Sequence, residues 1–180
     1  ADPDVDGAVI AAIQNGSMST LNCPEEVKLA ELLCELHPWS EMVRFARGGG
    51  AAMAVAARIA RAATGRDVIA FCGYHGWHDW YLAANLADDQ SLDGHLLPGL
   101  EPKGVPRNLK GTVLPFRYNN FEELEKLVRH NPEIGVIKTE VQRDVEPENN
   151  FLEKIRNLAT EKNIILIVDE CTSGFRETFG

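Results

Sequence analysis

The chain has 180 residues, 44% hydrophobic and 25% charged, which is the composition of an ordinary folded protein and excludes collagen-like and disordered classes. Its 18 Lys and Arg against 27 Asp and Glu give a formal charge of −9, which argues against a partner with a phosphate backbone. The longest aliphatic run, residues 164–168, is too short to cross a bilayer, and the acidic N-terminus does not resemble a secretory signal, so we expect a cytoplasmic protein with no membrane or nucleic-acid partner.

The first forty residues predict helices and no strand. Val5–Gln14 reads as a short helix that ends at Asn15-Gly16. A second helix begins at Pro24, has two glutamates in its first turn and an apolar stripe behind them, and ends before His37. We therefore expect residues 1–40 to form an N-terminal helical segment.

From residue 41 onward, apolar strands alternate with amphipathic helices. The predicted strands are 42–46, 68–72, 112–116, 134–140 and 164–169, and the predicted helices are 51–63, 121–130 and 151–162. Continuous apolar strands separated by helices indicate a mostly parallel sheet covered on both faces. The predicted class is α/β with three layers, and its ligands should bind beyond the carboxyl ends of the strands.

The triplet Gly48-Gly49-Gly50 leads from a predicted strand straight into a helix. Glycine lets the backbone approach a ligand closely, and the helix offers unpaired N–H groups to an anion such as phosphate. The alternative is a flexible connection without a ligand. The triplet matches neither the Walker loop nor the G-x-G-x-x-G motif.

Asp169 and Glu170 end the most apolar strand of the chain. A carboxylate at that point requires a cationic or hydrogen-bonding partner, and a protonated ring nitrogen would suit it. The alternative is that Asp169 caps the segment that follows.

The loop after the strand 68–72 contains Cys72, His75 and His78 at spacings that could suit a transition metal. One loop rarely closes a metal site alone, and the tryptophans around it favour packing or ring stacking. We therefore assign no metal and keep a metal-binding module as a third, weaker hypothesis.

Four segments together resemble the class III aminotransferases, which are pyridoxal-phosphate enzymes of fold type I, and most of all the branch of glutamate-1-semialdehyde aminomutase. They are residues 43–46 running into the glycine turn, 60–67, 73–79 and 168–176. Each segment is weak alone, but they stand in the order and spacing of the family over nearly the whole chain.

The resemblance implies a role for each matching residue. Gly49 and Gly50 match the turn that holds the cofactor phosphate, and Tyr74 matches the aromatic residue that stacks on the pyridine ring, with His75 beside it. Asp169 matches the carboxylate that pairs with the pyridinium nitrogen.

Two further positions match with changes. Cys171 stands where the family usually has Val against the other face of the ring. Glu140 matches an acidic residue near the active site, but Val141 replaces the usual Pro after it. Lys138 is unexpected in a strand that is otherwise apolar.

None of the lysines of this sequence occupies the family's Schiff-base motif. They are Lys28, Lys103, Lys110, Lys126, Lys138, Lys154 and Lys162. By the resemblance, residues 41–180 form part of the cofactor-binding large domain, while the Schiff-base lysine, the last strands and the small domain would follow Gly180.

Besides the metal-binding module, two main hypotheses for the function follow. The first is an aminotransferase or aminomutase that moves an amino group between an amino acid or amine and a keto acid or aldehyde, as a homodimer with pyridoxal phosphate. The second is a non-catalytic remnant of the same fold that acts in binding or interaction. Transamination without the lysine is expected to fail.

Overall fold

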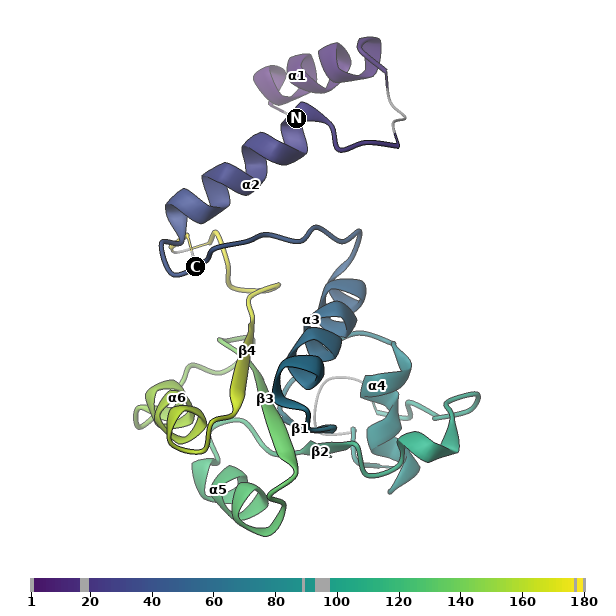
Figure 1. Cartoon of the computed structure of the whole chain (residues 1–180), viewed down its shortest axis with the longest axis vertical. Helices are drawn as coiled ribbons and strands as arrows, with labels where there is room; N and C mark the ends of the chain where they lie inside the picture. The colour runs from purple at the N-terminus through teal and green to yellow at the C-terminus, as the bar shows by residue number, and fades with distance from the viewer. Residues whose placement is uncertain (1, 17–19, 89, 93–97, 177, 180) are drawn as a thin grey trace. The chain divides into compact units, whose positions relative to one another are not determined.

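The computed structural model describes residues 2–16, 20–88, 90–92, 98–176 and 178–179 (Figure 1). The chain divides into two units, one up to Arg44 and one from Phe45 onward. The first unit holds helices α1 (Pro3–Gln14) and α2 (Pro24–Leu36), where the sequence predicts them. The Asp2 side chain caps α1 by accepting a hydrogen bond from the N–H of Asp4 at 2.9 Å.

The strand predicted at 42–46 is wrong. This segment has no ladder partner and no regular secondary structure in the part of the chain that the structure describes. It spans the division between the two units, and most of its side chains are exposed. A β-strand exists only where a neighbouring strand accepts and donates its backbone hydrogen bonds, and an apolar sequence pattern cannot supply that neighbour.

The second unit contains a four-stranded parallel sheet in the order β2-β1-β3-β4. Its strands are β1 (Val68–Phe71), β2 (Val113–Pro115), β3 (Ile134–Glu140) and β4 (Ile165–Asp169). All four were predicted within one or two residues, because buried parallel strands are apolar along their whole length. The predicted α/β class is therefore confirmed.

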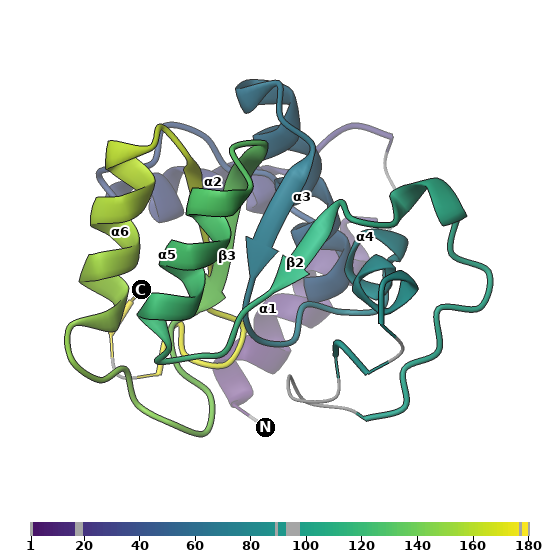
Figure 2. The ribbon, with the colours of Figure 1, turned by 90° about the horizontal axis from the view of Figure 1, so that it is seen from below.

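Helices cover both faces of this sheet (Figure 2). One face packs against α3 (Gly49–Thr64), the short α4 (Asp79–Leu82) and the 3-10 turn η1 (Ala83–Leu86) in one apolar cluster. A second apolar cluster joins the other face to α5 (Phe121–His130) and α6 (Phe151–Glu161), which lie side by side. A further 3-10 turn, η2 (Arg107–Leu109), precedes β2.

Parallel pairing brings the carboxyl ends of the strands to one edge of the sheet. In the β3–β4 register, Glu140 lies opposite Asp169, and Lys138 lies opposite Ile167. Side chains two residues apart on a strand share a face, so Lys138, Glu140 and Asp169 all lie on the face that α3 covers. This edge is where the sequence analysis expects a ligand.

Candidate functional site

Asp169 ends β4 and is only 4% exposed. Its Oδ2 lies 2.9 Å from His75 Nδ1 and 3.6 Å from Lys138 Nζ, and its Oδ1 accepts a hydrogen bond from the Cys171 N–H at 3.1 Å. Burial alone would raise the pKa of Asp169, but the His75 hydrogen bond and the Lys138 charge together hold it below its usual value. The carboxylate is thus ionised and held from three sides.

His75 is buried and contacts two oxygen atoms. Its Nδ1 faces Asp169, and its Nε2 lies 2.9 Å from the Cys72 carbonyl oxygen. Burial lowers the pKa of His75 to about 4, and the nearby Lys138 charge adds to this, although the hydrogen bond to Asp169 opposes it. At neutral pH the imidazole is therefore uncharged and donates through one nitrogen only.

Lys138 is completely buried in the middle of the sheet. Its ammonium group contacts Met53 Sδ on α3, and it lies 5.9 Å from the centroid of the Trp80 ring. Burial lowers the pKa of Lys138 to about 8, against the opposing effect of Asp169. From the sequence, Lys138 is visible only as a single charge inside an apolar strand, and that pattern assigns it no role.

Glu140 ends β3 and joins the aromatic loop to the sheet. Its Oε2 accepts a hydrogen bond from the Tyr74 N–H at 3.3 Å, and its Oε1 accepts one from Arg143 Nε at 3.0 Å. Burial raises the pKa of Glu140, and Arg143 opposes that rise. A Cβ on Gly73 would lie 2.3 Å from Glu140 Oε2, so the loop passes directly over this carboxylate. The sequence does not indicate a role for Arg143, because its contact with Glu140 depends on the path of the chain after β3.

Tyr74 is half-buried at the same edge of the sheet. Its ring meets the Tyr81 ring edge-on, with centroids 5.8 Å apart and an interplanar angle of 86°. The Arg143 guanidinium carbon lies 5.6 Å from the Tyr74 centroid. One aromatic ring is thus fixed beside the buried carboxylates, and one of its neighbours is a cation.

The glycine turn lies against the aromatic loop and Cys171. Helix α3 begins at Gly49, and its first return hydrogen bond is the one from the Ala52 N–H to the Gly48 carbonyl at 3.0 Å, so the amides before it precede the helical pattern. A Cβ on Gly76 would lie 2.6 Å from Gly50 Cα, and one on Gly49 would lie 3.7 Å from Cys171 Sγ. The residues named from the sequence, Gly49, Gly50, Tyr74, His75, Glu140, Asp169 and Cys171, all gather at this edge of the sheet.

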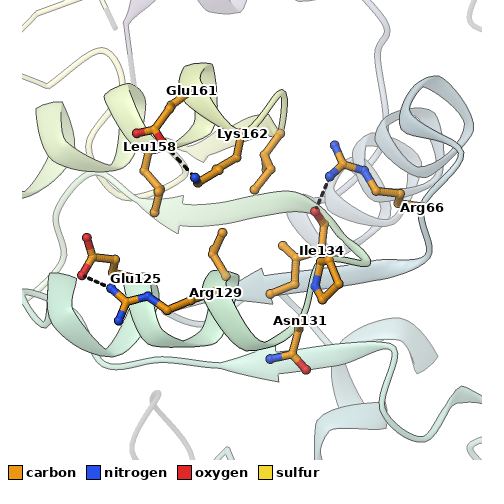
Figure 3. A pocket seen from close by; sticks show the side chains of 11 residues that line it. Arg66, Glu125, Arg129, Asn131, Ile134, Leu158, Glu161 and Lys162 are labelled. Atoms are coloured by element: carbon orange, nitrogen blue, oxygen red, sulfur yellow. Dashed lines mark hydrogen bonds and ion pairs between the residues drawn. The ribbon is translucent and has the colours of Figure 1, made fainter.

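One cavity adjoins the buried Glu140, and another lies at the far edge of the sheet. The first, of about 310 Å³, is lined by Gly73, Tyr118, Glu140 and Arg143, among others, and does not reach Asp169. The second, of about 380 Å³, lies at the opposite edge of the sheet, between the end of α5 and the end of α6 (Figure 3). Figure 3 shows its cations already engaged, Arg66 by the Ile134 carbonyl and Arg129 by Glu125.

The loop cysteine and histidines are engaged by protein groups. Cys72 Sγ lies 3.1 Å from Thr139 Oγ1, and burial raises the pKa of this thiol to about 12. His75 is held by Asp169, and His78 lies against Gly50. Within the described ranges no three His, Cys, Asp or Glu side chains form a group able to hold a metal ion.

The parallel sheet defines an α/β protein, and the buried, mutually paired ionisable groups at its carboxyl edge mark the candidate functional site. Comparison with known proteins narrows this class to one family. The family described as aminotransferase class-III matches residues 1–179, and the chain belongs to it. Among the described residues no helix is long and apolar enough to cross a membrane.

Solved structures with this fold include an omega-transaminase from Sphaerobacter thermophilus, 28% identical, with a TM-score of 0.81 over 96% of this chain and 41% of that one. A transaminase with PLP bound is 25% identical, with a TM-score of 0.82 over 96% and 41%. A glutamate-1-semialdehyde aminomutase from Pseudomonas aeruginosa PAO1, at 24% identity and a TM-score of 0.74 over 96% and 38%, shares the fold. The chain spans about two-fifths of the length of these proteins.

Proposed function

We propose that the chain is the pyridoxal-phosphate-binding part of an aminotransferase or aminomutase, which moves an amino group between an amino acid or amine and a keto acid or aldehyde. The observation that carries the proposal is Asp169, an ionised and buried carboxylate at the carboxyl edge of a parallel sheet, close to a bare glycine turn. We also propose that the protein is a homodimer, as the family resemblance implies, and that it is cytoplasmic, as the sequence suggests.

The residues present fit this cofactor at both of its charged ends. At one end, Asp169 can accept a hydrogen bond from a protonated ring nitrogen. At the other, the first amides of the 16-residue helix α3 suit a phosphate group, and the contact between Gly50 and Gly76 leaves no room for a Cβ. Tyr74, at the same edge of the sheet, offers an aromatic ring for stacking.

Pyridoxal phosphate, when bound, supplies an electron sink for the carbanion that a substrate forms on losing its α-proton. The residues of this chain then have distinct tasks. Asp169 holds the ring nitrogen protonated, and Tyr74 fixes the plane of the ring. Glu140 holds the Tyr74 backbone N–H and Arg143 in place, and we propose that it acts near the reacting atoms.

For the proposed enzyme, the amine that carries the cofactor would come from outside these 180 residues. Lys138 is the lysine that contacts Asp169, but its ammonium is engaged by that carboxylate and by Met53 inside the sheet. The alternative function is a cofactor-binding remnant without catalysis. It predicts that no segment with the Schiff-base lysine follows. Reading the open reading frame beyond Gly180 separates the two: a lysine strand followed by a small domain supports the enzyme, and a stop codon supports the remnant.

The test of the proposal is the visible spectrum of the natural gene product with pyridoxal phosphate, before and after an amino donor is added. We expect a cofactor band that the donor shifts. Asp169→Ala should abolish both cofactor retention and the donor response, whereas Asp67→Ala, an exposed aspartate at the other edge of the sheet, should leave both intact. An unchanged spectrum in Asp169→Ala contradicts the proposal.

A further inference from the structure

Lys138 occupies a place that the proposed chemistry does not require. It lies two residues before Glu140 on β3, on the same face of the sheet, and its side chain has no exposure to solvent. A buried ammonium group is unfavourable unless an anion pairs with it. Asp169 Oδ2, at 3.6 Å, is that anion, and it is also the oxygen that His75 contacts.

Both anionic and uncharged groups surround Lys138. The anions are Asp169 of β4 and Glu140 of β3, and both stabilise its charged form. The neutral groups are the Met53 thioether of α3, the Trp80 ring of α4, the Cys72 thiol, and the His75 imidazole. Lys138 is thus the cation that faces Asp169 from inside the protein.

Lys138 and His75 both contact Asp169, and the positive charge on Lys138 opposes a positive charge on His75. His75 has an acceptor at each nitrogen, Asp169 at Nδ1 and the Cys72 carbonyl at Nε2, and only a doubly protonated ring could donate to both. The Lys138 charge opposes that second proton. Removing the charge should therefore allow the imidazole to take the proton up.

A carboxylate that already faces one cation binds a second cation less strongly. The charge of Lys138 stabilises Asp169 in its ionised form, but it also repels positive charge at any atom bonded to Asp169. A ring nitrogen held by Asp169 must carry positive charge when protonated, so it experiences both effects.

Resting on the function proposed above, we infer that Lys138 is a positioning residue that acts through Asp169. It keeps this carboxylate ionised and His75 neutral, and it weakens the carboxylate as a partner for a protonated pyridine ring. With an apolar residue at position 138, the same site would hold the ring proton more tightly. Lys138 thereby limits the electron-withdrawing strength of the bound ring.

The experiment uses pyridoxamine 5′-phosphate labelled with ¹⁵N at the ring nitrogen, because this probe has no aldehyde and does not bond to lysine. The natural gene product is loaded with it, and the ¹⁵N shift is followed against pH in the wild type, Lys138→Met and Lys138→Gln. Lys138→Arg retains the charge, and Lys154→Met is the control on the exposed side of α6. In parallel, the ¹⁵N shifts of His75 are titrated in the protein without the probe.

In both neutral variants we expect the proton affinity of the ring nitrogen to rise threefold to tenfold. We also expect His75 to take up its proton at a higher pH. Lys154→Met should follow the wild type, and Lys138→Arg should lie nearer to the wild type than to Lys138→Met. A ring-nitrogen midpoint that does not move in the neutral variants overturns the inference. So does a wild-type His75 that titrates at or above the ordinary histidine value, a result that needs no variant.

The same experiment distinguishes this inference from the proposed function. If the probe binds and Asp169→Asn releases it, while the neutral variants at position 138 leave the ring nitrogen unchanged, only the role of Lys138 is overturned. If the probe does not bind, or binds equally well to Asp169→Asn, the proposed function fails and the inference fails with it.

Discussion

The two edges of the sheet use charge in opposite ways. At the amino edge, Arg66 donates to the backbone carbonyl of Ile134, and Arg129 pairs with Glu125 one helical turn away (Figure 3). At the carboxyl edge, Asp169 binds His75, 94 positions earlier in the sequence, and Lys138 on the neighbouring strand.

This difference is informative because the amino edge has the larger of the two cavities described above. Its charges are at least partly exposed: Arg66 is half-buried and donates to a backbone carbonyl, and Arg129 and Glu125 pair at the surface. At the carboxyl edge, Asp169 and Lys138 are buried and pair with each other. Buried charges that pair with one another therefore identify the candidate site better than cavity volume does.

The largest difference between the edges should appear on removing the buried anion. Asp169→Asn removes the anion nearest to the buried Lys138 side chain, so we expect a loss of roughly 3–5 kcal/mol in the free energy of unfolding. Asp67→Asn, at the exposed amino edge, should lose less than about 0.5 kcal/mol. Urea unfolding at pH 7 measures both, and equal losses would contradict the comparison.

The next largest effect should come from the contact between the glycine turn and the aromatic loop. Gly76→Ala places a Cβ 2.6 Å from Gly50 Cα at a φ of +97°, so we expect a loss on the order of 2–4 kcal/mol, together with loss of pyridoxamine phosphate binding. Gly104→Ala is the matched control, because its φ is +88° but no atom lies within 4 Å of the added Cβ. Only the backbone strain is common to both, and an equal loss in both would show that the contact is unimportant.

A smaller effect should appear in the dependence of stability on pH. Burial lowers the pKa of Lys138 from 10.5 to about 8, so between these values the unfolded chain binds a proton that the folded chain has released. Stability therefore rises with pH across this window relative to Lys138→Met, by on the order of 1–3 kcal/mol in total. Unfolding of both proteins at pH 7.5, 9 and 10 measures the difference, and parallel profiles would show that Lys138 titrates as an exposed lysine does.

The smallest effect should be at the amino edge. Arg129→Ala removes an exposed pair with Glu125 at 3.1 Å, and such pairs contribute little in water. We expect a change within about 0.5 kcal/mol and no change in the binding of pyridoxamine phosphate. A loss of binding in this variant would move the candidate site to the cavity of Figure 3.

The sequence predicts most of the second unit because its elements are strongly patterned. The strand at 134–140 and the helix at 121–130 are recovered to the residue, since their apolar patterns are regular and Asn120 caps the helix. The segment 42–46 is also largely apolar, but it pairs with no strand among the described residues, and a single sequence does not reveal which strands become neighbours.

The candidate site is predictable only in part, for the same reason. Asp169 and the glycine turn are visible as polar or flexible residues that end or interrupt apolar elements. The roles of Lys138 and Arg143 depend on the β3–β4 register and on the path of the loop over Glu140, which are tertiary facts. Lys138 could be seen as anomalous, but its partner could not be named.

The β3–β4 pairing also has a consequence for how this sheet assembles. The four consecutive aliphatic residues Ile165–Val168 could pair with β3 in several registers and make comparable apolar contacts in each. A shift of β4 by one residue relative to β3 would turn Asp169 to the opposite face of the sheet. There it would lie away from Lys138, in the apolar cluster beneath α5 and α6. The pairing of Asp169 with Lys138 therefore favours the observed register of β4 over the shifted ones.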